Sequence, residues 1–533
     1  MNTLLQTTES VSAAAQQIFS AQVLLAILLA ALYGLSVGAI PGLTATMAVA
    51  LVIPVTFFLD DMTAIAVIVT LEACSIFAGD IPTALVRIPG TPSSAAYTDD
   101  AYSLTRQGRH QQSLGVSLVF SVAGGLFGAL VLILAAPQLA RIALLFTTYE
   151  YFWLYVLGLS CAAIVSHGSR LRGGLALVIG LLFSTVGLSE VHSAPRFTFG
   201  RDELITGVNF IPAMIGLFGV SEVLRNVISS SSPGDSAARP PVSDAEPAAR
   251  GLIQRFIAPV FRGTVPLLWQ RKFHALRSCV VGAVVGMIPG AGADIGAWIS
   301  YAVSKRFSRT PDAYGKGSLE GIADATAANN AALAGAWIPA LVFGIPGDSV
   351  TAIVIGVLLM KNIQPGPEIF SDPQQSQLVY GIYLTFLLAN VLLIPLGFLA
   401  IRIGSLLVRI PRSTLMPMIL VFCIVGAYAI NGSYFDVWVM LGMGLLGFVL
   451  DKSRIPLGPV VLGIILGGKL EQSFIQNLSK DGDLTTFFTR PISAVLSVLC
   501  LSLWLGGPLL GWIRGRRVVS RSEVQRARDV SRD

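Results

Sequence analysis

The chain has 533 residues, of which 54% are hydrophobic and only 12% are charged, and its formal net charge is +6. An average soluble domain carries about 25% charged residues, so this composition excludes an ordinary soluble protein. The basic residues lie in short loops between apolar runs, which is typical of a membrane protein and argues against nucleic-acid binding. The cysteines lie singly without CxxC spacing, so the sequence predicts neither a metal site nor a disulfide framework.

The first half of the chain is a series of apolar runs. Residues 1–20 are polar, and we expect them to form a periplasmic N-terminal segment. A first transmembrane repeat is predicted over residues 21–228, with apolar runs at 21–37, 43–59, 63–78, 114–136, 151–165, 173–188 and 205–224. The longer runs approach the roughly 20 residues that a helix needs to cross a hydrocarbon core of about 30 Å.

A linker separates this half from a second one. Residues 229–275 are first rich in Ser, Pro and Asp and then basic, which predicts a cytoplasmic linker. A second transmembrane repeat is predicted over residues 276–490. A last transmembrane helix is expected at 491–513, outside the repeat, and the tail at 514–533 is basic and therefore predicted to be cytoplasmic.

Two motifs occur once in each half. Gly34-Leu-Ser-Val-Gly-Ala-Ile-Pro-Gly42 has the spacing of Gly282-Ala-Val-Val-Gly-Met-Ile-Pro-Gly290, 248 residues later. The pair Ile81-Pro82 and Ile88-Pro89-Gly90 returns after 257 residues, as Ile338-Pro339 and Ile345-Pro346-Gly347. Proline and glycine interrupt a helix and release backbone groups, so each motif predicts a broken or re-entrant helix. Matched broken helices in two halves indicate the binding site of a secondary transporter.

The charges of equivalent loops predict how the halves are oriented. Asp60-Asp61 corresponds to the basic stretch 305–309, and the basic loop 106–110 corresponds to the acidic loop 361–377. Because basic loops face the cytoplasm, the two halves are expected to have inverted topology. The predicted fold is an all-α integral membrane protein of about 12 transmembrane helices, with a periplasmic N-terminus and a cytoplasmic C-terminus.

The broken helices would present free N–H groups and small polar side chains to a carboxylate substrate. The alternative is that Gly and Pro merely allow close helix packing. The candidate substrate-binding residues lie in or beside the four motifs: Pro41, Gly42, Thr44, Pro89, Gly90, Thr91, Ser93, Ser94, Pro289, Gly290, Gly292, Asn329, Asn330, Pro346, Gly347 and Ser349.

Ionisable residues beside these motifs are functional candidates, because charges inside a membrane are costly. Arg87 could hold a substrate carboxylate with its fork of donors, or it could form a structural pair with one of the acids. Asp80, Asp294 and Asp348 are candidates for coupling to a cation or a proton. Glu72 has the weakest claim, since it could face a partner helix. No catalytic residue is predicted.

Several of these stretches resemble the TctA family, the large membrane subunit of tripartite tricarboxylate transporters. They are Gly38-Ala-Ile-Pro-Gly-Leu-Thr-Ala-Thr-Met, Ile88-Pro-Gly-Thr-Pro-Ser-Ser, Pro289-Gly-Ala-Gly-Ala, Ala327-Ala-Asn-Asn-Ala and Gln364-Pro-Gly-Pro, and the resemblance spans roughly residues 20–510. It implies a bacterial inner-membrane carrier that works with a small TctB-like membrane subunit and a periplasmic TctC-like solute-binding protein. It also implies uptake driven by a sodium or proton gradient without ATP, and the chain accordingly has no Walker A motif. No cofactor is predicted. Asp80, Arg87, Asp294 and Asp348 depart from the family pattern and leave the choice of carboxylate open.

The sequence therefore predicts a secondary transporter of organic carboxylates, citrate-like or related. A stand-alone carrier or exporter that needs no binding protein is the main alternative. A channel is less favoured, because paired broken helices are typical of carriers. An intramembrane enzyme is disfavoured, since no HExxH, GxSxG or paired-aspartate arrangement is convincing.

Overall fold

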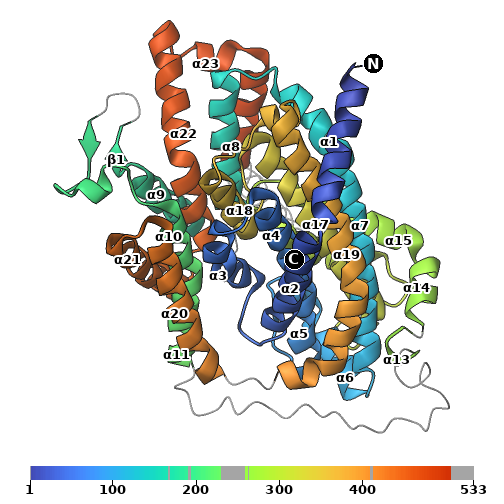
Figure 1. Cartoon of the computed structure of the whole chain (residues 1–533). Helices are drawn as coiled ribbons and strands as arrows, with labels where there is room; N and C mark the ends of the chain where they lie inside the picture. The colour runs from blue at the N-terminus through green and yellow to red at the C-terminus, as the bar shows by residue number, and fades with distance from the viewer. Residues whose placement is uncertain are drawn as a thin grey trace, which may run out of the picture.

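The computed structural model describes residues 2–165, 169–189, 194–229, 258–261, 263–408 and 412–505. Most of the predicted linker, the end of the last helix after residue 505 and the basic tail lie outside these ranges. Within them the chain is helical, apart from an antiparallel ribbon of β1 (Gly187–Leu188) and β2 (Pro195–Arg196). Figure 1 shows this ribbon beside α9, at one edge of the molecule.

The first half of the chain contains the following helical elements. They are α1 (Asn2–Ile18), α2 (Ala21–Gly38), α3 (Ala45–Phe57), α4 (Asp61–Ala78), α5 (Asp80–Val86), η1 (Ser94–Tyr97), α6 (Thr98–Arg106), α7 (His110–Ala143), α8 (Thr148–Val165), α9 (Arg170–Ser184), η2 (Asp202–Leu204), α10 (Phe210–Met214), the π-helical η3 (Ile215–Val220) and α11 (Ser221–Ser229).

The second half has a corresponding series. Its elements are α13 (Ala258–Phe261), α14 (Thr264–Gln270), α15 (Lys272–Gly286), α16 (Gly292–Phe307), η4 (Pro311–Ala313), α17 (Leu319–Phe343), α18 (Ser349–Met360), η5 (Pro367–Phe370), α19 (Pro373–Leu407), α20 (Arg412–Asn431), α21 (Tyr434–Lys452), α22 (Leu457–Asp481) and α23 (Thr486–Thr489). A further apolar helix occupies Pro491–Leu505.

The lengths of the apolar helices confirm an all-α membrane protein. Among the described residues, six helices are long and apolar enough to cross a membrane, and four more are apolar but shorter. Two of the short ones, α3 and α18, follow the predicted breaks and have 13 and 12 residues. At 1.5 Å per residue each is about 20 Å long, less than the hydrocarbon thickness of about 30 Å. Helix α3 and helix α18 are therefore too short to cross the membrane alone.

The first motif packs in the same way in both halves. A Cβ atom added to Gly34 on α2 would lie 2.8 Å from the carbonyl oxygen of Leu71 on α4. The equivalent Gly282 on α15 would meet the carbonyl of Ala328 on α17 at 2.1 Å. Because 34 and 282 differ by 248, and 71 and 328 by 257, these are equivalent contacts of the repeat. The close-packing interpretation thus accounts for these glycines.

The second motif ends a helix in the same way in both halves. Arg87 and Gly344, each just before Ile-Pro-Gly, adopt left-handed backbone conformations with φ of 57° and 65°. The next N–H donates to the carbonyl of the proline six residues earlier, at 3.4 Å in the first half and 3.2 Å in the second. The chain therefore leaves both helices through the same turn.

The segment after each turn is capped reciprocally. Thr91 and Ser94 each accept a hydrogen bond from the other's backbone N–H, both at 3.1 Å. Asp348 and Thr351 do the same at 2.8 and 2.9 Å, and this capping box starts α18. A capping box satisfies N–H groups that a helix leaves free at its first turn.

Two groups of helices surround these breaks. Helices α2, α4, α7, α15, α17 and α19 pack around one another as an inner group. In the outer group α9 packs on α22, and α21 packs on η3 and α11, so each half pairs with the other. Figure 1 shows α8, α9, α10, α20, α21 and α22 on the left, with α3 and α18 between them and the inner group. The direction in which each half crosses the membrane, and the domain boundaries, stay predictions.

Candidate functional site

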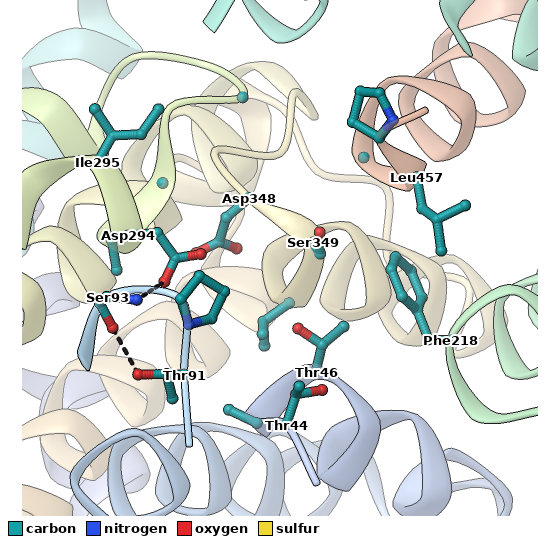
Figure 2. A pocket seen from close by; sticks show the side chains of 18 of the residues that line it. Thr44, Thr46, Thr91, Ser93, Phe218, Asp294, Ile295, Asp348, Ser349 and Leu457 are labelled. Carbon is teal, nitrogen blue, oxygen red and sulfur yellow. Dashed lines mark hydrogen bonds between the residues drawn. The ribbon is translucent and has the colours of Figure 1, made fainter. Parts of the chain in front are cut away.

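A pocket of about 330 Å³ lies where the broken helices meet the outer group. This volume is at the lower end of the range of roughly 300–1,000 Å³ for small-molecule sites. Four helix N-termini line it, those of α3, α16, α18 and α22. Figure 2 shows side chains from all four around one space.

The first half contributes hydroxyl groups. Thr44 caps α3, its hydroxyl accepting from the N–H of Met47 at 3.2 Å, and Thr46 follows on the first turn. Thr91 and Ser93 lie in the segment after the break, with their hydroxyl oxygens 2.8 Å apart. These groups can donate to or accept from a ligand.

The second half contributes carboxylates at equivalent positions. Asp294 on α16 corresponds to Thr46, and Asp348 before α18 corresponds to Thr91. Asp294 Oδ1 accepts a hydrogen bond of 3.0 Å from the N–H of Ser93, which joins the two halves across the pocket. Asp348 lies against Gly292, where an added Cβ would be 2.8 Å from its Cβ.

The outer group supplies a wall that sequence reasoning missed. Phe218 on η3 and Leu457 on α22 are apolar parts of it. Arg225 on α11 pairs with Glu222, and its Nη1 lies 3.9 Å from Asp451 Oδ2. These residues belong to no repeated motif, and the only signal was a charge directly after the apolar run at 205–224.

The pocket is lined by more acidic than basic side chains. Four carboxylates line it (Glu222, Asp294, Asp348 and Asp451), and one guanidinium, that of Arg225. The helix N-termini add partial positive charge, equivalent to about half an elementary charge each. The site therefore offers donors to an anion and separate carboxylates to a cation or proton.

The structure brings eight of the candidate residues to this pocket. They are Thr44, Thr91, Ser93, Gly290, Gly292, Asp294, Asp348 and Ser349. The others do not line it: Pro41, Gly42, Asp80, Arg87, Pro89, Gly90, Ser94, Pro289, Asn329, Asn330, Pro346 and Gly347. Many of these shape the backbone; for instance, a Cβ on Gly90 would lie 2.4 Å from the carbonyl oxygen of Gly79.

The structure does not place Arg87 in the pocket. It ends α5 in a left-handed conformation and pairs with Asp99 at 2.8 Å, with both side chains about 60% exposed (59% and 61%). Its partner is none of the three aspartates considered from the sequence. Exposed pairs of this kind contribute little to stability.

Asp80 is also placed elsewhere. It is buried and accepts hydrogen bonds from the hydroxyl of Tyr97, at 2.5 Å, and from that of Ser117. These contacts tie α5 to η1 and α7, so the carboxyl group has a structural role in this conformation.

The two asparagines lie inside the inner group. Asn330 Nδ2 donates to the carbonyl of Thr326 at 3.3 Å, within α17. Asn329 is 2% exposed, and its Oδ1 has no hydrogen-bond partner among the described residues. Neither amide reaches the pocket.

Comparison with known proteins agrees with this architecture. Residues 24–462 match the model of the tripartite tricarboxylate transporter TctA family. An uncharacterized 52.8 kDa protein in the TAR-I ttuC' 3'region of Agrobacterium vitis is 34% identical over 481 residues, 88% of this chain and 90% of the relative. An uncharacterized protein in the TAR-II ttuC' 3'region of the same organism is 35% identical over 240 residues, 44% of this chain and 97% of the relative. No solved structure matches the chain. The chain thus belongs to the TctA family of tripartite tricarboxylate transporters, as a multi-pass membrane component.

Proposed function

We propose that this chain is the translocating subunit of a binding-protein-dependent secondary transporter that takes up organic carboxylates. The observation that carries the proposal is the convergence of four helix N-termini, hydroxyl groups and Arg225 on one pocket. Helix N-termini and arginine favour anions, and planar carboxylates suit the guanidinium fork. Asp294 and Asp348 are the candidates for coupling uptake to a sodium or proton gradient.

The proposed assembly has three parts in the bacterial inner membrane and periplasm. A small TctB-like membrane subunit and a periplasmic TctC-like binding protein would accompany this chain, whose N-terminus would be periplasmic and C-terminus cytoplasmic. Purification in mild detergent from native membranes, followed by mass spectrometry, tests this. A co-purifying small membrane protein and a cross-linked periplasmic protein would support it. Uptake of citrate into liposomes by this chain alone would instead favour a stand-alone carrier.

The arrangement of the pocket also supports a mechanism. One wall of the pocket belongs to the outer group, and the others come from α3, α16 and α18, which pack on α4 and α17 of the inner group. Movement of the inner group together with these three helices along the outer group would carry the site across the membrane, as in an elevator. Ser349 on α18 and Gly458 on α22 face each other across this boundary, with a Cβ on Gly458 3.9 Å from Ser349 Oγ. A disulfide between Ser349→Cys and Gly458→Cys should stop transport, and reduction should restore it. Transport that persists in the oxidised double variant, with each single variant as control, would rule out this movement.

A further inference from the structure

Glu72 is a carboxyl group buried in the middle of the inner group. Its side chain is 0% exposed, on α4, which is part of a candidate span, residues 61–86, in which residues 62–85 are all buried. The helices around α4 are α1, α2, α3, α5, α7, α17, α18 and α19. The residue is therefore shielded from both water and lipid.

Only one hydrogen-bond donor reaches this carboxyl group among the described residues. The indole N–H of Trp337 on α17 donates to Glu72 Oε2 at 2.9 Å, while Oε1 has no partner. Trp337 is itself held by edge contact with Phe386, whose ring centre is 5.4 Å away. None of the ion pairs in the described part of the chain involves Glu72. An ionised carboxylate in this place would suffer a large desolvation penalty that one neutral donor does not offset.

The repeat supplies an internal comparison. Glu72 corresponds to Asn329, 257 residues later on α17. Asn329 is equally buried, and its Oδ1 likewise has no hydrogen-bond partner among the described residues. The fold therefore accepts a neutral amide at this position, and a neutral carboxyl group has nearly the same shape.

Glu72 is also linked to the pocket. Ile76, one turn further along α4, lines the pocket, as does Asp348, the N-cap residue of α18. The remaining titratable side chains on the elements around α4 are Glu9 on α1, Tyr33 on α2, Asp80 on α5, His110 and Arg141 on α7, Glu320 and Asp324 on α17, and Tyr380, Tyr383 and Arg402 on α19; α3 and α18 contain none.

We propose that Glu72 carries the coupling proton of this transporter, an inference that rests on the transport function proposed above. The carboxyl group is protonated in the conformation described here, in which it is sealed from water. In the cycle it takes one proton from the aqueous phase on one side and returns it on the other, and no other bond forms or breaks. A proton suits this site better than a metal ion, because hard cations need several oxygen ligands and the neighbour of Glu72 is an N–H donor.

Infrared spectroscopy of the purified full-length chain tests the protonation without any substrate. The wild type should show a carbonyl band of a protonated carboxylic acid at neutral pH, and Glu72→Gln should lose that component. Asp324→Asn is the matched control, because Asp324 is also 0% exposed but is paired with Arg271 and Arg277. An unchanged band in Glu72→Gln would overturn the proposal. Thermal unfolding checks that each variant is folded, and Glu72→Asp, which keeps the acid, should keep a band.

Transport by the assembled complex in liposomes tests the coupling, with citrate as the probe and an internal pH dye. Glu72→Gln should lose citrate-driven proton uptake and accumulation against a gradient, yet keep citrate exchange, which needs no net proton movement. Retention of wild-type proton uptake by Glu72→Gln, or a wild type driven by sodium without proton flux, would overturn the proposal. If the wild type moves no citrate, the proposed function fails for this substrate, and the infrared result still decides whether Glu72 is protonated.

Discussion

The two halves of the chain form the same backbone break but place different chemistry in it. The first half lines the pocket with Thr46 and Thr91, and the second half has Asp294 and Asp348 at the equivalent positions. Hydroxyl groups can bind a carboxylate by hydrogen bonds, whereas aspartates repel it unless a cation or proton is present. Under the proposed function, the first half would thus bind the carboxylate and the second half would interact with the coupling ion.

This difference is not needed for folding. Thr91 caps its segment with Ser94 by the same pair of hydrogen bonds that Asp348 forms with Thr351. A threonine therefore performs the structural role at this position. The negative charge of Asp348 is an addition to that role, and it is the part of the side chain that would act on a cation or a proton in the pocket.

The largest expected effect concerns what the two halves share. Gly286→Ala places a Cβ 2.2 Å from the carbonyl of Ala332, and Gly38→Ala places one 2.4 Å from the carbonyl of Ser75. Both should lower the free energy of unfolding by ~3 kcal/mol or more, which is the upper end of the usual cost of overpacking a core. The cost is high because the backbone of the neighbouring helix must move. Thermal unfolding in detergent measures this. Gly442→Ala, with no atom within 4 Å, is the control and should be tolerated. Unequal effects of the first two would break the equivalence of the halves.

A second prediction removes the difference between the halves. Asp348→Thr gives the second half the side chain of Thr91 while keeping a capping group. We expect gradient-driven uptake to fall about ten- to a hundredfold, because the variant loses the contribution of one hydrogen bond to a charged group. Stability should change little, because threonine is also a good capping residue. Uptake measured with sodium and proton gradients imposed separately would show which ion depends on Asp348. Wild-type uptake under both gradients would contradict the assignment, and Thr91→Ser is the matched control.

A third prediction compares two arginines. Arg225 lines the pocket, whereas Arg87 is exposed and paired with Asp99. Arg225→Gln should raise the half-saturating concentration of the carboxylate about tenfold or more, because a charged hydrogen bond is lost. Arg87→Gln should leave it unchanged. A raised half-saturating concentration in Arg87→Gln but not in Arg225→Gln would contradict this prediction. Arg87, and not Arg225, would then be the arginine that binds the carboxylate.

The smallest expected effect concerns an element that, within the described part of the chain, occurs in the first half alone. The β1–β2 ribbon is held to α22 by Arg196, which donates two hydrogen bonds of 2.8 and 3.0 Å to Glu471. Both side chains are partly exposed, so Glu471→Gln should lower the free energy of unfolding by no more than about 1 kcal/mol. A larger shift in thermal unfolding would mean that this ribbon organises the outer group.

Local features of the structure follow directly from the sequence. Proline removes a hydrogen-bond donor, and glycine or a capping threonine ends or starts a helix in almost any surroundings. The breaks at Pro89 and Pro346 and the membrane class of the protein could therefore be predicted. The equal spacing of the motifs is matched by equal packing of their helices in the structure, because identical glycine patterns allow identical close approaches.

Which side chains reach the pocket was decided only by the tertiary structure. Asp294 lies in the pocket and Asp80 does not, although both lie beside a repeated motif. The direction in which each side chain points depends on how the helices of the two halves pack. Arg225 comes from a helix far along the chain, and no local pattern marks it as a neighbour of Asp348. The sequence alone determined where the helices break, and the packing of distant helices decided what those breaks face.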